Sequence, residues 1–301
     1  MRIAVAATPE VSLPTLDALL QSDHELLFVI TQPDRPAGRG QALKESPVST
    51  WCSKNDVACL KPSNTAETLE LLAGIDLMIT IGYGVLLPVQ ILNAPRHGCI
   101  NLHFSLLPRW RGAAPVQRAI EAGDLLSGVT VFKLDEGMDT GPIYRVARFA
   151  LDADITSDEL LIELAEIGAE PVLDSISDIE AGIRPVAQTS EGVTRAMKLS
   201  KAESEIDWTM SADAIVNKVR AFTSNPGAWT IFRGTTIKVD DVVATQEKFT
   251  PGEIHVIEKA LLVGTATSAI MVGFLTPSGK SRTDAKSWLN GARIQSGDHF
   301  G

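Results

Sequence analysis

Short apolar runs alternate with helix-like segments through the first part of the chain. The apolar runs have the length of buried strands, and leucines recur at helical spacing between them, as from Leu13 to Leu20. We therefore predict strands at residues 2–7, 26–31, 57–60, 77–81 and 99–103. Strands that alternate with helices pair in parallel through right-handed crossovers. The pattern predicts an α/β fold with a Rossmann-like, mostly parallel sheet and helices on both faces.

Two further strand-like runs, 129–134 and 143–151, precede the longest helical segment. Thr156-Ser157-Asp158-Glu159 has the form of a capping box, in which a threonine and a glutamate side chain satisfy free backbone N–H groups. Pro171 lies inside this segment. We expect it to kink or divide the helix, because proline lacks the N–H of the helical hydrogen bond.

A mostly polar stretch at 184–206 follows, and the pattern changes beyond it. A helical segment at 212–222 precedes short strand-like runs that turn residues separate. These runs are residues 229–232, 236–243, 252–258, 260–263 and 268–276. Short strands at this spacing predict a small β-barrel with an OB-like architecture. We therefore expect an α/β domain at 1–187, a linker at 188–206 and an OB-like domain at 207–301.

The composition is typical of a globular protein from a reducing compartment. The chain has 301 residues, of which 45% are hydrophobic and 21% charged, and its sequence contains neither a membrane-length apolar run nor a signal-peptide core. The three cysteines, Cys52, Cys59 and Cys99, are odd in number and lack the spacing of metal ligands. We expect a cytoplasmic protein without disulfides or bound metal.

The net charge is −10, which by itself argues against a nucleic-acid partner. The charge is unevenly distributed, however, because the segment between Phe149 and Ile183 holds ten acidic residues and no Lys or Arg. These are Asp152, Asp154, Asp158, Glu159, Glu163, Glu166, Glu170, Asp174, Asp178 and Glu180. The other 27 acidic residues balance the 27 basic ones. The acidity therefore belongs to one segment and does not exclude a phosphate-rich partner elsewhere.

The densest group of chemically active residues begins at Asn101. Asn101 and His103 are two residues apart in a predicted strand, so their side chains emerge on the same face. They lie at the carboxyl end of that strand, where open α/β sheets place ligand sites. An amide beside an imidazole suits carbonyl chemistry, because the amide can stabilise an oxyanion and the imidazole can carry a proton. From spacing alone, a hydrogen-bonded core histidine beside a strand-end cap is an equally good interpretation.

A carboxylate would orient the imidazole, and three acids in a later loop are candidates. Asp135, Glu136 and Asp139 follow the strand-like run at 129–134. Spacing does not choose among them. A solvated acidic turn fits equally well, because glycines occupy positions 137 and 141.

The motif Asn101-x-His103-x-Ser105-Leu106-Leu107-Pro108, followed by Asp139-Thr140-Gly141, resembles the folate-dependent formyltransferase family. The run from Arg109 to Ile120 is its most distinctive part, and the resemblance extends over essentially the whole chain. It implies 10-formyltetrahydrofolate as the formyl donor. As acceptor it implies the amino group of methionine on initiator methionyl-tRNA.

By motif position, the resemblance implies that Asn101, His103 and Asp139 are the catalytic residues. Asn101 would hold the formyl oxygen, and His103, charged and oriented by Asp139, would stabilise the tetrahedral intermediate. The residues that would line the folate site are Ser105, Leu106, Leu107 and Pro108. It is the resemblance, not the spacing, that favours Asp139 over Asp135.

The loop that begins at Asp34 is rich in proline, glycine and positive charge, a composition typical of a solvated surface loop. The resemblance implies that Arg35, Arg39 and Lys44 meet the acceptor end of the tRNA. The OB-like domain would add tRNA affinity. We expect a monomer that does not bind membranes.

This chain departs from the family pattern at three places, of which Pro142 after Asp139-Thr140-Gly141 is the mildest. Gln41-Ala42 stands where many relatives have consecutive lysines, which lowers the positive charge of the loop. Phe104 stands beside the catalytic strand where relatives usually have a small residue.

Other functions are compatible with parts of the pattern. A formyltransferase for a small amine, such as a nucleotide-sugar N-formyltransferase or a glycinamide ribonucleotide transformylase, would share the catalytic residues, as would a formyltetrahydrofolate hydrolase. The loop at 34–40 and the run at 109–120 disfavour the small-amine enzymes, and the hydrolase stays open as a further variant. A non-catalytic nucleotide- or RNA-binding protein would carry Gly-x-Gly-x-x-Gly after the first strand, where this chain has Ala7-Thr8-Pro9-Glu10.

Overall fold

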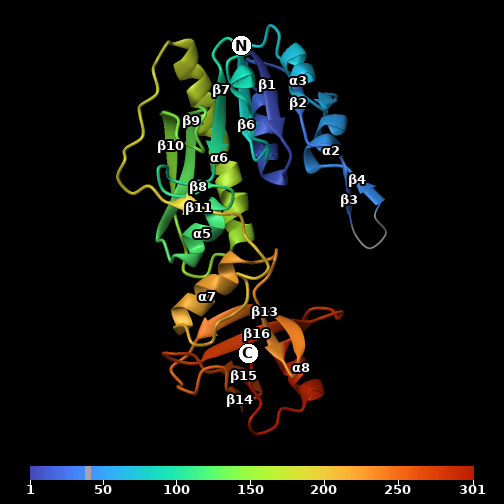
Figure 1. Cartoon of the computed structure of the whole chain (residues 1–301), viewed down its shortest axis with the longest axis vertical. Helices are drawn as coiled ribbons and strands as arrows, with labels where there is room; N and C mark the ends of the chain where they lie inside the picture. The colour runs from blue at the N-terminus through green and yellow to red at the C-terminus, as the bar shows by residue number, and fades with distance from the viewer. Residues whose placement is uncertain (38–41) are drawn as a thin grey trace. The chain divides into compact units, whose positions relative to one another are not determined.

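The computed structural model describes residues 1–37 and 42–301, which form two compact units (Figure 1). The N-terminal unit comprises Met1–Pro115, Leu126–Ala150 and Leu161–Ala196. The C-terminal unit comprises Val116–Leu125, Leu151–Leu160 and Met197–Gly301.

The N-terminal unit is built on a seven-stranded sheet with the order β10-β9-β7-β6-β1-β2-β5. Its strands are β1 (Arg2–Ala7), β2 (Glu25–Ile30), β5 (Ala58–Leu60), β6 (Leu77–Ile81), β7 (Cys99–His103), β9 (Leu126–Lys133) and β10 (Ile143–Ala150). Every neighbouring pair is parallel except those that involve β9, which is antiparallel to both β7 and β10. The prediction of a mostly parallel α/β sheet is confirmed.

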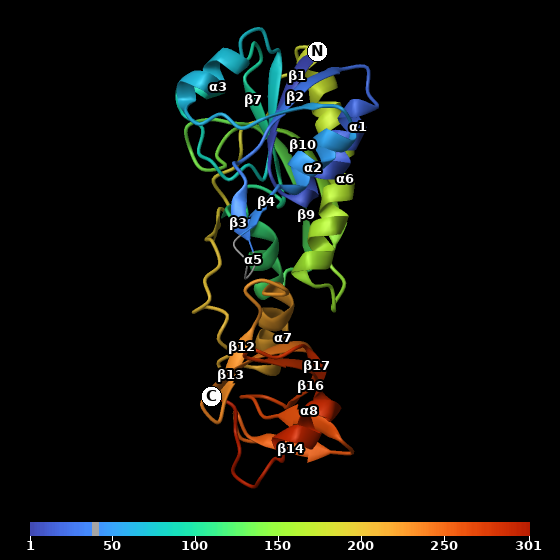
Figure 2. The same ribbon diagram turned by 90° about the vertical axis from the view of Figure 1, so that its right-hand side faces the viewer.

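Helices cover both faces of this sheet. The helical elements of this unit are η1 (Glu10–Ser12), α1 (Leu13–Leu20), α2 (Pro47–Lys54), α3 (Thr65–Leu71), α4 (Val89–Leu92) and most of α6 (Ser157–Glu180). All of α5 (Pro115–Glu121) except its first residue falls in the C-terminal unit. Figure 2 shows α1 and α6 on one face and α3 on the other. A Cβ atom on Gly168 of α6 would lie 2.8 Å from the Leu102 side chain, so glycine allows α6 to approach β7 closely. Leu102 therefore faces α6, and its neighbours Asn101 and His103 point to the opposite face.

Helix α6 begins with the predicted capping box. The backbone N–H of Thr156 donates to the Glu159 carboxylate at 2.9 Å, and the N–H of Glu159 donates to the Thr156 hydroxyl at 3.4 Å. The helix continues through Pro171 to Glu180, so of the two expected effects of this proline, a kink or a division, the division does not occur. Fully buried residues on both sides of the proline, among them Leu164 and Val172, hold the two halves of the helix in place.

The C-terminal unit contains an antiparallel curled sheet with the order β12-β13-β16-β15-β14, and β17 pairs with β16. Its elements are α7 (Ala212–Ala221), β12 (Trp229–Phe232), β13 (Thr235–Ala244), β14 (Ile254–Ile257), β15 (Ala260–Val263), β16 (Ile270–Pro277), β17 (Thr283–Asp284) and α8 (Ala285–Ala292). Isolated bridges join Phe232 to Phe300 and Glu253 to His299, so the chain's last residues connect the two edges of the sheet. The predicted small β-barrel is confirmed.

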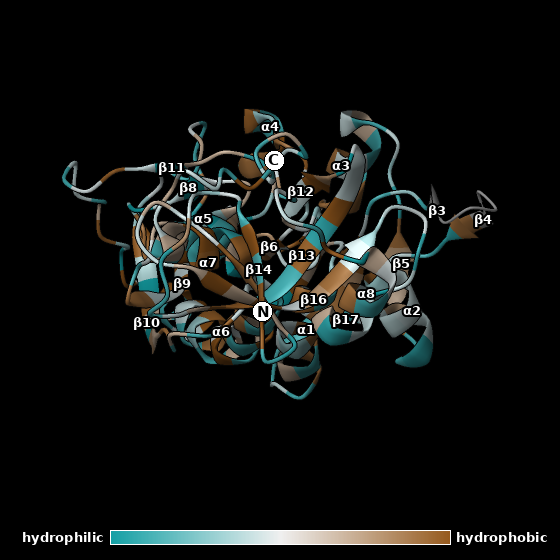
Figure 3. Ribbon diagram, turned by 90° about the horizontal axis from the view of Figure 1, so that it is seen from below, coloured by the Kyte–Doolittle hydropathy of each residue, from teal (hydrophilic) through white to brown (hydrophobic). Residues whose placement is uncertain are grey.

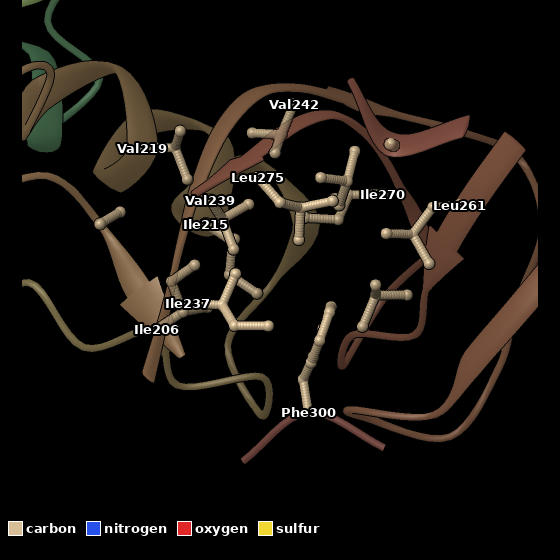
Figure 4. Packing of buried hydrophobic residues seen from close by; sticks show 14 of the residues in the cluster. Ile206, Ile215, Val219, Ile237, Val239, Val242, Leu261, Ile270, Leu275 and Phe300 are labelled. Carbon is tan, nitrogen blue, oxygen red and sulfur yellow. The ribbon is translucent and has the colours of Figure 1, made fainter. Parts of the chain in front are cut away.

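The barrel has its own apolar core. Figure 3 shows hydrophobic and polar residues alternating along β13, as expected for a strand with one buried face. Figure 4 shows the inward side chains of Ile237 and Val239 gathered with those of Ile270 and Phe300. The α7 residue Ile215 joins the same cluster.

Two short strand pairs complete the described structure. β8 (Arg111–Gly112) pairs in parallel with β11 (Arg195–Ala196), so part of the stretch predicted as a linker lies in the N-terminal unit. β3 (Arg35–Ala37) pairs with β4 (Ala42–Lys44) in a segment predicted to be a loop. Among the described residues, no helix has the length and apolar character needed to cross a membrane.

Candidate active site

Asn101 lies near the end of β7, next to Thr80 of β6 and Phe132 of β9 in the sheet register. The Thr80 hydroxyl donates to the Asn101 side-chain oxygen at 2.7 Å. This hydrogen bond fixes the orientation of the amide, because the oxygen is occupied and the NH₂ group is turned away from Thr80. An oxygen atom near Asn101 would therefore meet a pre-oriented donor.

His103 ends the same strand and is 6% exposed. Its Nε2 atom lies 2.9 Å from the backbone oxygen of Trp110, and its ring meets the Phe132 ring edge to face with the centroids 6.3 Å apart. Because a carbonyl oxygen only accepts, Nε2 carries the proton in this contact. The other ring nitrogen, Nδ1, faces a carboxylate.

That carboxylate belongs to Asp139, whose Oδ2 atom lies 3.8 Å from Nδ1 of His103. The same oxygen accepts a hydrogen bond from the backbone N–H of Gly112 at 2.7 Å. Because β9 is antiparallel to β7, the loop that carries Asp139 leaves the sheet where β7 begins and doubles back toward His103. Asp139 itself has a left-handed backbone conformation with φ = 53°.

The other two acids of this loop have different surroundings. Asp135 accepts hydrogen bonds from the Gly137 N–H at 3.1 Å and from the Thr140 hydroxyl at 2.7 Å, so it shapes the turn. Glu136 is exposed. Within the residues that the structure describes, no cluster of His, Cys, Asp and Glu has the arrangement of a metal site.

Gln188 and Arg111 support the Asp139 loop. The Gln188 amide donates to the backbone oxygens of Asp139 and Gly141 at 2.9 and 2.8 Å. Its side-chain oxygen accepts two hydrogen bonds from the Arg111 guanidinium, at 3.2 and 2.7 Å. All donors and acceptors of the Gln188 amide thus act on the segments that hold Asp139.

The segment around Gly112 is held by the chain beyond α6. The Thr194 hydroxyl accepts from the Trp110 N–H at 2.9 Å, and β8 pairs with β11. Gly112 has φ = 129°, and a Cβ atom there would lie 2.5 Å from the backbone oxygen of Ala196. Only glycine fits this close approach.

The residues expected to line a folate site form a turn after β7. Ser105 is buried and its hydroxyl donates to the Arg109 backbone oxygen at 2.7 Å. The Thr130 hydroxyl donates to the backbone oxygen of Ser105 at 2.7 Å and accepts from the backbone N–H of Leu107 at 3.1 Å. Leu106 and Pro108 are half-buried.

The residues expected to meet tRNA are only partly covered by the structure. Arg35 begins β3, and Lys44 ends β4 with an exposed side chain. Arg39 lies outside the described residues, as does Gln41.

Sequence reasoning missed Thr80, Gln188 and Thr194. Thr80 lies in an apolar run typical of a buried strand. Nothing in the sequence indicates that it pairs with Asn101 in the sheet. Gln188 and Thr194 lie in a polar segment without periodicity, where one polar residue is indistinguishable from the next. Gly112 was inside the quoted family motif, but its contact with Asp139 was not foreseen.

Comparison with known proteins places the chain in a family. Residues 1–175 match the family model described as formyl transferase, and residues 198–293 match the model described as formyl transferase, C-terminal domain. The chain therefore belongs to the formyl transferase family.

The curated relatives share one name. The chain is 41% identical to the methionyl-tRNA formyltransferase of Salinispora tropica, over 99% of both chains. It is 42% identical to that of Thermobifida fusca, over 100% of this chain and 99% of the relative. Among solved structures, WlaRD, a sugar 3N-formyl transferase crystallised in the presence of dTDP and 5-N-formyl-THF, gives a TM-score of 0.70 over 93% of this chain and 99% of its own. Its sequence identity is 18%, so this last likeness concerns the fold.

Proposed function

We propose that this enzyme transfers the formyl group of 10-formyltetrahydrofolate to the amino group of methionine on initiator methionyl-tRNA, for translation initiation. The observation that carries this proposal is the end-to-end similarity, at about 40% identity, to relatives named for that reaction. The arrangement of Asn101, His103 and Asp139 supports it independently, because it combines an oriented amide donor with an imidazole that faces a carboxylate.

In the proposed reaction the methionyl nitrogen bonds to the formyl carbon, and the bond from that carbon to the folate nitrogen breaks. One proton leaves the amine and one reaches the folate nitrogen. A free α-amino group has a pKa of about 7.7–8.0, so a useful fraction is neutral at physiological pH and the demand for base catalysis is light. The larger demand is for charge stabilisation at the formyl oxygen.

Each catalytic residue has one role in this proposal. Asn101 donates its amide to the formyl oxygen, where negative charge develops. His103, charged and oriented by Asp139, stabilises that charge. Asp139 touches His103 rather than the reacting atoms, so it is a positioning residue.

The remaining contacts are assigned by motif. Ser105, Leu106, Leu107 and Pro108 line the folate site, and Arg35, Arg39 and Lys44 contact the tRNA. The catalytic domain spans 1–187 and the tRNA-binding OB-like domain spans 207–301, joined by 188–206. We propose a cytoplasmic monomer that needs no metal.

The decisive experiment is a formylation assay with 10-formyltetrahydrofolate and three acceptors: charged initiator tRNA, charged elongator methionine tRNA and a dTDP-amino sugar. We expect rapid formylation of initiator methionyl-tRNA and none of the sugar. Transfer to the sugar alone would reject the proposal. Release of formate without any formylated product would indicate a hydrolase instead.

A salt series tests the tRNA contacts separately. Phosphate contacts release counterions, so the logarithm of the tRNA affinity should fall linearly with the logarithm of salt concentration. We expect Lys44→Ala to weaken binding and to flatten this slope by up to about one contact. Lys54→Ala, which removes an equally exposed charge at the end of α2, serves as the matched control.

A further inference from the structure

The N-terminal unit has a concave site at the edge of the sheet where β7 begins. Its volume is about 630 Å³. Its walls are the residues that precede β7, the last residue of β9, the beginning of β10 and the segment after α6. We call it the basic hollow and define it by Arg96, His97, Lys133, Tyr144, Ile183 and Arg184.

The basic hollow is separate from the candidate active site. His97 and Gly98 precede the first residue of β7, whereas His103 is its last. A strand rises about 3.3 Å per residue, so about 13 Å of β7 separates the two. Neither Asn101, His103 nor Asp139 lines the basic hollow.

Three side chains of the basic hollow carry a full positive charge that no acid neutralises by direct contact. Arg96, Lys133 and Arg184 are all exposed, and none of them forms an ion pair with a carboxylate in the part of the chain that the structure describes. Lys133 extends over Gly98, where a Cβ atom would lie 3.9 Å from Nζ. In a protein with a net charge of −10, such a group of cations is a local reversal of sign.

Two carboxylates that interact electrostatically with residues of the basic hollow are already bound elsewhere. Asp178 accepts two hydrogen bonds of 2.6 Å from Arg145. Asp76 accepts the Arg2 backbone N–H at 2.8 Å, and this bond is the main reason why the pKa of Asp76 is lowered; the charges of Arg96 and His97 contribute less. The positive charge of the basic hollow is therefore available to an anion from solution.

The other side of the basic hollow is aromatic and apolar. Tyr144 is half-buried, and burial, with a smaller contribution from the charge of Asp178, raises the pKa of its phenol, so the ring stays neutral. Ile183 is 54% exposed, and prolines 95, 142 and 185 also line the hollow. Apolar and aromatic side chains such as these bind an aromatic ring. A few polar groups that converge on the same site give it specificity.

We propose that the basic hollow binds a nucleoside diphosphate or triphosphate. Arg96, Lys133 and Arg184 would hold the phosphates, for which guanidinium and ammonium groups are the usual partners. Tyr144 and Ile183 would contact the base. The cationic and apolar halves match the two halves of a nucleotide, and the volume is in the range of small-molecule sites.

Calorimetric titration of the full chain with ADP, pyrophosphate and adenosine tests this proposal. We expect ADP to bind more tightly than pyrophosphate, and adenosine to bind more weakly than either. Arg96→Gln/Arg184→Gln should lower the ADP affinity by about a hundredfold, since each lost charged hydrogen bond corresponds to roughly a factor of ten. Tyr144→Leu should weaken ADP binding and leave pyrophosphate binding unchanged.

The matched control is Lys54→Gln/Arg148→Gln, which removes the same charge from exposed positions of the same unit outside the basic hollow. This control should keep the ADP affinity of the unmodified protein. Absence of ADP binding, an equal loss in the control, or pyrophosphate binding as tightly as ADP would each overturn the proposal. A selective loss of tRNA affinity in Arg96→Gln/Arg184→Gln would identify the surface as part of an RNA interface instead. Formyl transfer should remain unchanged in all variants, so the test is independent of the proposed function.

Discussion

The Oδ2 atom of Asp139 lies 3.8 Å from Nδ1 of His103, and the backbone N–H of Gly112 holds the same oxygen at 2.7 Å. The carboxylate thus has a fixed partner that does not depend on the imidazole. Because that partner is a backbone group of β8, the pairing of β8 with β11 sets where the carboxylate stands. Asp139 can be changed chemically without losing its position.

Asp139→Asn should therefore fold normally and lose turnover. The asparagine oxygen can still accept from Gly112, but the negative charge that faces His103 is gone. We expect kcat to fall by about 10²–10³-fold, the usual scale for losing one group that stabilises an oxyanion. The matched variant is Asp135→Asn, which keeps its acceptor for Gly137 and Thr140 and should stay within a few-fold of the unmodified enzyme. A larger loss at Asp135 than at Asp139 would refute the assignment.

Thr80→Val should weaken the role of Asn101 in the reaction while leaving the Asn101 side chain itself unchanged. Valine has the shape of threonine but cannot donate to the Asn101 oxygen, so the amide loses its fixed orientation. We expect kcat to fall by about tenfold, the value of one hydrogen bond, with KM for tRNA unchanged. Asn101→Ala removes the donor itself and should cost about 10²–10³-fold.

Thr15→Val is the control for Thr80→Val. Thr15 is also fully buried, and its hydroxyl has no hydrogen-bond partner among the described residues. This change should leave kcat unaltered and should not lower the thermal midpoint. Equal activity of Thr80→Val and Thr15→Val would remove Thr80 from the site.

Gln188→Leu should loosen the loop that carries Asp139. The change removes two donors to that loop and the acceptor for Arg111. We expect the free energy of unfolding to fall by about 1–3 kcal/mol and kcat to fall further than KM rises. Urea unfolding and steady-state kinetics measure the two effects, and Ser190→Ala at an exposed neighbouring position is the control.

The strand pattern could be predicted well where apolar runs end at breakers. The expected bounds 2–7, 77–81 and 99–103 coincide with β1, β6 and β7. The direction of β9 could not be predicted, because an apolar run has the same pattern whichever way the strand points. The sequence also did not decide between a kink and a division at Pro171; α6 is continuous there, because packing outweighs the local cost of a proline.

The site was predictable only in part for a related reason. Asn101 and His103 share a face because a strand has a period of two, and this follows from the sequence. The contact between His103 and Asp139 depends on a loop that doubles back, and no periodicity describes such a path. Gln188 reaches the same loop from 47 residues beyond Gly141, a separation over which local patterns carry no information.

Gly112→Ala should disrupt the site through the backbone. Its φ of 129° disfavours any side chain, and the new Cβ would meet the Ala196 oxygen at 2.5 Å. Neither backbone can shift without breaking the pairing of β8 and β11. We expect a loss of about 1–3 kcal/mol of stability together with most of the activity. Gly84→Ala tests positive φ alone, because φ is 75° there and a Cβ would meet nothing within 4 Å; it should cost less and spare turnover.

A thiol pair lies apart from the proposed active-site residues and gives a test that does not depend on function. The Ser49 hydroxyl lies 3.7 Å from the sulfur of Cys59 in β5, and the thiol of Cys52 in α2 interacts with the same sulfur. The interaction with Cys52 is the main reason why the pKa of Cys59 falls to about 6. Ser49 and the charge of Lys61 lower it further, against the opposing effect of burial. The same interaction raises the pKa of Cys52, and burial raises that of Cys99 to about 12.

Cys59 should therefore be the thiol that reacts first with iodoacetamide in the native protein. Its rate of alkylation, followed by mass spectrometry, should rise with a midpoint near pH 6, while Cys52 and Cys99 stay unmodified because both are buried and protonated. Lys61→Met should move the midpoint upward, and Lys54→Met should not.

The pKa of Cys59 is lower in the folded than in the unfolded chain, where it is about 9. Its ionisation therefore stabilises the fold fully above pH 9, and this contribution is lost as the pH falls to about 6. The difference in unfolding free energy between the unmodified protein and Cys59→Ser should grow over that window; a difference that shrinks from pH 6 to 9, or a midpoint near 9, would refute the depressed pKa.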